Sequence, residues 1–102
     1  MAYIKVGNES EIVEGKALTV RTKQGRIGLT RINGEIRAFE DVCTHDDGPL
    51  ADGDIEGEEI ICPRHGARFN MCTGKVTKMP ATEDIEVYPI RVTDGVVEVD
   101  MG

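Results

Sequence analysis

Glycine and proline divide this chain into short runs, and that division constrains its fold more than any other feature of the sequence. The 102 residues contain twelve glycines and four prolines. Between them, apolar and polar residues alternate over short stretches, as they do in half-buried strands, and the breaks are typical of turns. No apolar period of 3.6 residues persists long enough to form a long helix. The sequence therefore predicts an all-β fold.

Two dipeptides predict tight β-hairpins within that fold. Asn33-Gly34 and Asp94-Gly95 each lie between alternating runs. Both positions of a two-residue hairpin turn need a positive φ, which these residue types adopt most readily. We expect antiparallel strands in the outer parts of the chain at residues 3–6, 17–22, 26–32, 35–39, 83–92 and 96–99.

The middle of the chain, roughly residues 41–80, has a different character. It contains all the cysteines and histidines and three of the four prolines. Two short strands fit inside it, at 59–62 and 67–70. A chain of this length fits one domain and leaves no room for a second. We therefore predict a single domain, residues 1–102, with a loop-rich subdomain inserted into its β scaffold.

Charge limits the classes of partner. Nineteen acidic and twelve basic residues give a formal net charge of −7. Nucleic-acid binding requires a basic footprint, which this sequence lacks. The charge either steers the protein toward a basic face of a partner or only provides solubility.

No apolar run approaches the roughly 20 residues of a membrane span, and the N-terminus lacks the apolar region of a signal peptide. We expect a soluble, cytoplasmic protein with no nucleic-acid or membrane partner.

Metal-binding residue types gather at two places in the middle segment. One residue separates Cys43 from His45, and two residues separate Cys62 from His65. An odd number of cysteines without a secretory signal argues against a disulfide framework. Ordinary buried cysteines beside unrelated histidines are the alternative, but both histidines of the chain would then have to fall beside a cysteine by chance. The four residues are predicted to bind a metal centre.

Two kinds of metal centre compete at this stage. A structural zinc site also uses two cysteines and two histidines, but it usually pairs Cys with Cys and His with His. Here each loop offers one of each. That arrangement suits a two-iron cluster with both cysteines on one iron and both histidines on the other, which is the ligand division of a Rieske centre.

The two motifs look like the two halves of the Rieske motif, Cys-x-His and Cys-x-x-His. The likeness continues through residues 69–74, 80–81 and 88–99, so it covers nearly the whole chain. The sequence resembles the small bacterial Rieske-type [2Fe–2S] ferredoxins. This resemblance implies an antiparallel β-sandwich base and an inserted subdomain that binds one [2Fe–2S] cluster. The implied ligands are Cys43, His45, Cys62 and His65.

The resemblance also implies a place for other residues. Both imidazoles would lie near the surface, and Pro80 would lie in a third loop over the cluster. Rieske proteins of respiratory complexes carry a disulfide between the cluster loops, and the corresponding positions here are Gly48 and Arg64. Their Ser and Tyr hydrogen-bond donors to sulfur correspond to Ala67 and Phe69. Missing donors imply a potential near the low end of the Rieske range, about −150 mV.

Three further residues are assigned from their positions. Cys72 falls where the family pattern requires no cysteine, so we expect an unligated turn residue, with a redox-sensitive role as the lesser alternative. Asp46 and Asp47 follow His45 and either add negative charge near the cluster, which disfavours reduction, or form only a solvated loop.

The function implied is that of a one-electron carrier and not an enzyme. The chain has two histidines, and the cluster would use both, so none is left to bind a mononuclear iron. The sequence also lacks a glycine fingerprint for binding flavin or nicotinamide. We expect a monomeric ferredoxin component that passes electrons from a flavin-dependent reductase to the terminal oxygenase of a dioxygenase system. The alternatives are a small Rieske subunit of a nitrite-reductase-like enzyme and a zinc-stabilised interaction module.

Overall fold

Antiparallel strands account for nearly all the regular structure of the computed structural model, which describes residues 3–44 and 47–101. A single 3-10 turn, η1 (Glu9–Glu11), is the only helical element in these ranges. The prediction of an all-β fold is confirmed. The strands form three sheets. The first is β1-β11-β10 (Tyr3–Asn8, Val96–Asp100 and Ile90–Thr93). The second is β2-β3-β4-β9 (Leu18–Thr22, Gly25–Ile32, Glu35–Glu40 and Val87–Tyr88). The third is β5-β6-β7-β8 (Ile55–Glu56, Glu59–Ile61, Arg68–Asn70 and Val76–Lys78).

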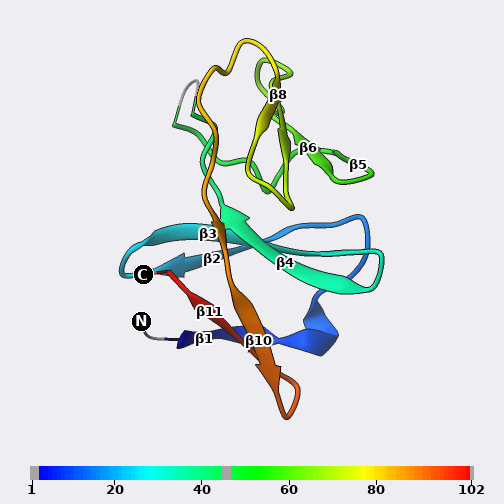
Figure 1. The fold of residues 1–102 in the computed structure, drawn as a ribbon, viewed down its shortest axis with the longest axis vertical. Helices are drawn as coiled ribbons and strands as arrows, with labels where there is room; N and C mark the ends of the chain where they lie inside the picture. Colours follow the sequence, from blue (N-terminus) through cyan, green and yellow to red (C-terminus); the bar gives the residue numbers. More distant parts are fainter. Residues whose placement is uncertain (1–2, 45–46, 102) are drawn as a thin grey trace.

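The three sheets follow one another along the longest axis of the molecule, which measures 40 Å (Figure 1). The first sheet lies at the lower end of the view, the second lies in the middle, and the third lies at the upper end beyond β4. The third sheet is built from a continuous part of the chain inside the segment expected to form the inserted subdomain. Across the described ranges, no helix is long and apolar enough to cross a membrane.

Both predicted hairpin turns are confirmed. Asn33 and Gly34 have φ values of 52° and 83°, and Asp94 and Gly95 have values of 51° and 78°. In each hairpin the residues that flank the two-residue turn are direct partners in the ladder. The turns therefore fix the register of β3 with β4 and of β10 with β11.

The expectation of one strand over residues 83–92 is wrong. The structure breaks this run at Pro89 into β9, which pairs with β4, and β10, which pairs with β11. Proline has no N–H to donate to a ladder, so the chain changes sheets at this point. The middle segment also contains two strands that the sequence pattern did not predict, β5 and β8.

The second sheet is covered on both faces, which explains how the third sheet is held. One face packs against the first sheet through an apolar core that includes Ile27, Leu29 and Val97. The other face contributes to a second core with the loops and strands of the third sheet. Phe39 is fully buried in that second core. The middle segment is therefore packed onto the scaffold and does not extend freely from it.

Candidate metal centre

The predicted ligands come from two loops with the same backbone hydrogen bonds. The first ligand loop, residues 43–48, follows β4, and the second ligand loop, residues 62–67, connects β6 to β7. In each loop the cysteine N–H donates to the carbonyl five residues later, Cys43 to Gly48 and Cys62 to Ala67, both at 2.7 Å. In each loop the N–H four residues later donates back to the cysteine carbonyl, at 2.7 Å in the first and 3.0 Å in the second.

The two loops also turn at equivalent positions. The residue four places after each cysteine has a positive φ, 61° at Asp47 and 77° at Gly66. Glycine adopts this conformation without strain, and aspartate tolerates it better than most residues. The described ends of the two loops therefore share the same backbone hydrogen bonds and the same turn position, although the spacings Cys-x-His and Cys-x-x-His differ.

Burial separates the two kinds of predicted ligand. Cys43 and Cys62 are 0% and 1% exposed and belong to the apolar core beneath the loops. His65, three residues after Cys62, is exposed. The second loop thus holds its thiol inside the protein and presents its imidazole toward solvent. His45 and Asp46 lie outside the described residues, so their predicted roles stay predictions.

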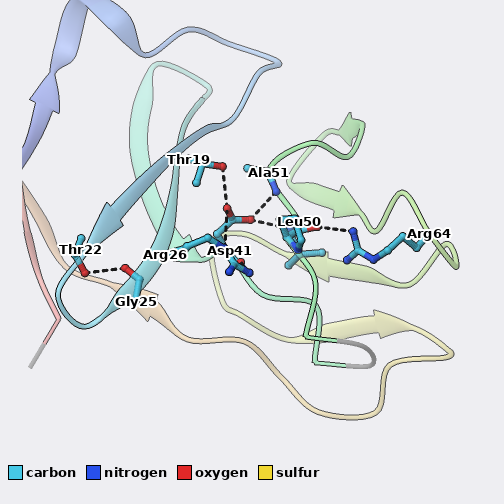
Figure 2. A network of polar contacts seen from close by, with 9 residues as sticks. Thr19, Thr22, Gly25, Arg26, Asp41, Leu50, Ala51 and Arg64 are labelled. Atoms are coloured by element: carbon cyan, nitrogen blue, oxygen red, sulfur yellow. Dashed lines mark hydrogen bonds and ion pairs between the residues drawn. The ribbon is translucent and has the colours of Figure 1, made fainter.

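Asp41 anchors the first ligand loop (Figure 2). Its carboxylate is fully buried and accepts hydrogen bonds from the Leu50 and Ala51 amides at 2.6 and 2.7 Å and from the Thr19 hydroxyl at 2.8 Å. Arg26 lies 3.9 Å away and donates to the Asp41 carbonyl at 3.1 Å. One side chain therefore joins the start of the loop, its end and the second sheet. The sequence pattern did not predict this role for Asp41.

A second contact joins the first ligand loop to the segment after β8. The Thr44 hydroxyl donates to the Glu83 carbonyl at 2.6 Å. This segment begins at the cis Met79–Pro80 bond, and Pro80 is exposed. The chain at Glu83 therefore lies against the first loop, and the expectation that Pro80 lies in a third loop over the cluster stays a prediction.

The described residues include three of the four predicted ligands, Cys43, Cys62 and His65. Among residues 3–44 and 47–101, no three His, Cys, Asp or Glu side chains gather closely enough to hold a single metal ion. A two-iron cluster needs only two protein ligands on each iron, because bridging sulfides complete the coordination. Cys43 and Cys62 are the predicted first pair, and His65 belongs to the predicted second pair.

A family comparison decides the class. Residues 2–89 match the model of the Rieske [2Fe-2S] domain. The chain belongs to this Rieske family. Its curated relatives include the ferredoxin component of the naphthalene 1,2-dioxygenase system of Pseudomonas putida, 39% identical over 90% of this chain and 88% of the relative. They also include the ferredoxin component of the 2,4-dinitrotoluene dioxygenase system of a Burkholderia strain, 45% identical over 88% of this chain and 86% of the relative.

Solved structures agree with the Rieske assignment. The Sphingomonas yanoikuyae B1 ferredoxin is 26% identical, with a TM-score of 0.93 over 99% of this chain and all of that one. A chain in a complex of reduced oxygenase and oxidized ferredoxin of carbazole 1,9a-dioxygenase is 33% identical, with a TM-score of 0.88 over 95% of this chain and 91% of that one. The predicted resemblance is confirmed, as is the prediction of a Rieske electron carrier of an oxygenase system and not a catalyst.

The Rieske loops of this chain are joined without a disulfide. All three cysteines are described, and none is disulfide-bonded. The positions assigned to the respiratory disulfide, Gly48 and Arg64, lie against each other, since a Cβ at Gly48 would stand 2.6 Å from Cζ of Arg64. Ala67 and Phe69 are fully buried beside Cys62 in the same core, and neither has a hydroxyl.

Cys72 lies in the turn that follows β7. It borders a cavity of about 550 Å³ that is otherwise lined by β4, β9, Met71 and the start of β10. Burial raises the pKa of the Cys72 thiol above its usual value, and the Glu58 and Glu35 carboxylates act in the same direction against Arg37. A raised pKa lowers the thiolate fraction and with it the reactivity. These observations favour the expectation that Cys72 is an unligated turn residue.

Proposed function

We propose that this chain carries one Rieske [2Fe–2S] cluster and passes single electrons from a flavin-dependent reductase to the terminal oxygenase of a dioxygenase system. The proposed ligands are Cys43 and Cys62 on one iron and His45 and His65 on the other. The observation that carries the proposal is the pair of matched loops, each of which buries its cysteine in the core.

The chain's own residues account for how such a group is held. The N–H groups of Cys43 and Cys62 are used in the loop hydrogen bonds, which fix the position of each thiol. The apolar core beneath excludes water from the sulfur side. The exposed His65 marks the opposite side as the place where a redox partner approaches. The bound cluster supplies the one-electron chemistry, and the protein supplies orientation and shielding.

The partners are proposed from the relatives and from the charge. The relatives are ferredoxin components of dioxygenase systems, and one similar chain was solved in complex with an oxygenase. The reductase, the monomeric state and a cytoplasmic location are part of the proposal. A net charge of −7 suits partners that present basic docking faces. No observation on the described residues favours a zinc-stabilised interaction module or a small Rieske subunit of a nitrite-reductase-like enzyme over the electron carrier.

Electron paramagnetic resonance of the reduced protein tests the ligand assignment. We expect the low average g-value of a cluster with histidine ligands, and a red-brown protein in place of a colourless zinc protein. His45→Cys and His65→Cys should each abolish or convert that signal. Cys72→Ser is the matched control and should leave it unchanged, because Cys72 faces the cavity beside β4. Loss of the signal in Cys72→Ser would contradict the assignment.

The rate of electron transfer tests the partners. Mixing the protein with the reductase and terminal oxygenase of a naphthalene 1,2-dioxygenase system should give transfer that slows as salt rises from about 0.01 to 0.15 M. Over this range the Debye length falls from about 30 to 8 Å, which weakens attraction between an acidic carrier and basic faces. Rates that stay flat or increase with salt would count against acidic steering.

A further inference from the structure

Arg64 reaches from the second ligand loop to the first. It is the only lysine or arginine in the two loops, residues 43–48 and 62–67. Its Nη1 donates to the Pro49 carbonyl at 2.9 Å (Figure 2). A Cβ built on Gly48 would lie 2.6, 2.7 and 2.8 Å from Cζ, Nη2 and Nε of Arg64. Three guanidinium atoms at nearly equal distances mean that the planar group presents its face to Gly48.

This contact falls on a part of the chain that is itself fixed. Pro49 precedes Leu50, whose N–H is held by the buried carboxylate of Asp41. Asp41 in turn accepts the Thr19 hydroxyl of β2. Arg64 is therefore linked to the second sheet through two groups of hydrogen bonds, those of Pro49 and those of Asp41, which the Pro49–Leu50 peptide bond connects. The two loops leave different sheets, so their relative position depends on contacts of this kind.

We propose that Arg64 is a positioning residue that clamps the two ligand loops together through Gly48 and Pro49 and thereby slows loss of the cluster. The proposal rests on the cluster proposed above. The clamp needs a glycine at 48, because any side chain there would displace the guanidinium. It also needs the planar fork of arginine, since a lysine ammonium cannot lie flat on a backbone and donate at the same time.

The cationic charge of Arg64 adds a separate effect on the reduction potential. A cation beside a group that gains an electron favours the reduced form. Charge and clamping can be separated, because Gly48→Ala displaces the guanidinium and keeps its charge. The displaced side chain is long and flexible, so the fold can accommodate the change. Arg64→Met removes both the charge and the hydrogen bond at nearly the same length.

The experiment measures how fast a chelator bleaches the visible absorbance of the oxidised protein. Arg64→Met and Gly48→Ala should both lose the cluster roughly five- to thirtyfold faster than the wild type, the effect expected for one or two lost contacts. Arg64→Lys should be intermediate. Arg91→Met is the matched control, because Arg91 is exposed on β10 and binds Glu98, so its rate should stay within about twofold of wild type.

The reduction potential reports the charge of Arg64 and separates its effect from that of the clamp. It should fall in Arg64→Met and stay nearly unchanged in Arg64→Lys and in Gly48→Ala. Bleaching rates within about twofold of wild type in both Arg64→Met and Gly48→Ala would overturn the clamp. Fast bleaching in Arg64→Met with a normal rate in Gly48→Ala would also overturn the clamp, because loss of the Arg64 charge would then explain the faster loss of the cluster.

A second measurement separates this proposal from the proposed function. Hydrogen exchange of the Asp47 and Gly66 amides, which close the two loops, is followed on the protein as purified. Both amides should exchange faster in Arg64→Met and Gly48→Ala and as in wild type in Arg91→Met. Unchanged exchange would overturn the clamp whatever metal is bound. A wild-type protein without the Rieske signal would overturn the proposed function and leave this exchange test valid.

Discussion

The two ligand loops have the same internal hydrogen bonds but are held in place by different means. The second loop closes a hairpin whose flanking residues, Ile61 and Arg68, are direct partners in the β6–β7 ladder. Backbone pairing on both sides therefore positions it. The first loop belongs to a longer connection from β4 in the second sheet to β5 in the third. β4 precedes it, but no ladder in the described residues pairs its two ends with each other, and it depends on the buried carboxylate of Asp41.

The difference shows that the same loop hydrogen bonds can be supported either by pairing of the adjacent strands or by a buried side chain outside the loop. A hairpin loop needs only a residue that accepts a positive φ, because short-range pairing brings its ends together at low entropic cost. A long connection between sheets needs a strong acceptor at its start that binds amides at its far end. The comparison can be tested by disturbing each loop through the feature that holds it.

Asp41→Ala should have the largest effect, and on the first loop. It leaves the Leu50 and Ala51 amides and the Thr19 hydroxyl without their buried acceptor. The expected loss is about 3–5 kcal/mol in the free energy of unfolding, measured by urea denaturation. Thr19→Val is the control, because it removes one donor and leaves both amides paired, and it should cost about 1 kcal/mol. A cost below that of Thr19→Val would show that the carboxylate does not hold the loop.

Gly66→Ala should have the next largest effect, and on the second loop. The φ of 77° disfavours any Cβ, although no atom lies within 4 Å of where that Cβ would be. The cost is therefore one of backbone conformation alone, about 1–2 kcal/mol. Thermal loss of the visible absorbance, compared with that of Asp41→Ala, checks it. A neutral substitution would mean that the ladder tolerates a different loop conformation.

Ala67→Ser and Phe69→Tyr should change the reduction potential of the proposed cluster. Each adds a hydroxyl to a buried position in the core beside Cys62. A hydrogen bond to sulfur that strengthens on reduction by about 1 kcal/mol corresponds to tens of millivolts in a one-electron couple. Both variants should therefore shift upward in protein-film voltammetry. No upward shift, in variants whose crystal structures show the new bonds, would require another cause for the low potential, such as solvent exposure.

The same contrast explains what the sequence could predict. The turns at Asn33-Gly34 and Asp94-Gly95 were predictable because the required φ limits the residue types. The Cys and His pairs are specific in chemistry and spacing, and they lie within the range that matches the Rieske domain, so the family was predictable while the ligand set stays a prediction. These are local features, and a sequence displays them directly.

The features that the sequence did not predict depend on distant partners. Asp41 binds amides nine and ten residues ahead and a hydroxyl 22 residues back. Because every residue except proline has a backbone N–H, the sequence does not indicate which amides a carboxylate will bind. The strands β5 and β8 contain two and three residues and lie at the edges of the third sheet, where they pair with β6 and β7. Pro89 did signal the break between β9 and β10, but the alternation around it outweighed that signal.

Asp47→Gly should have the smallest effect and the opposite sign. Asp47 occupies the position in the first loop that Gly66 occupies in the second, with a φ of 61°. Glycine relieves the residual strain of a side chain in this conformation, so we expect a gain of about 0.5 kcal/mol in the free energy of unfolding. Asp47→Asn separates conformation from charge, because asparagine tolerates the same φ and removes only the carboxylate. The asparagine variant should keep the stability of the wild type, and the two variants should share the same small rise in potential. If Asp47→Gly instead lowers stability, then the aspartate side chain itself supports the first loop, and the two loops differ at this position as well.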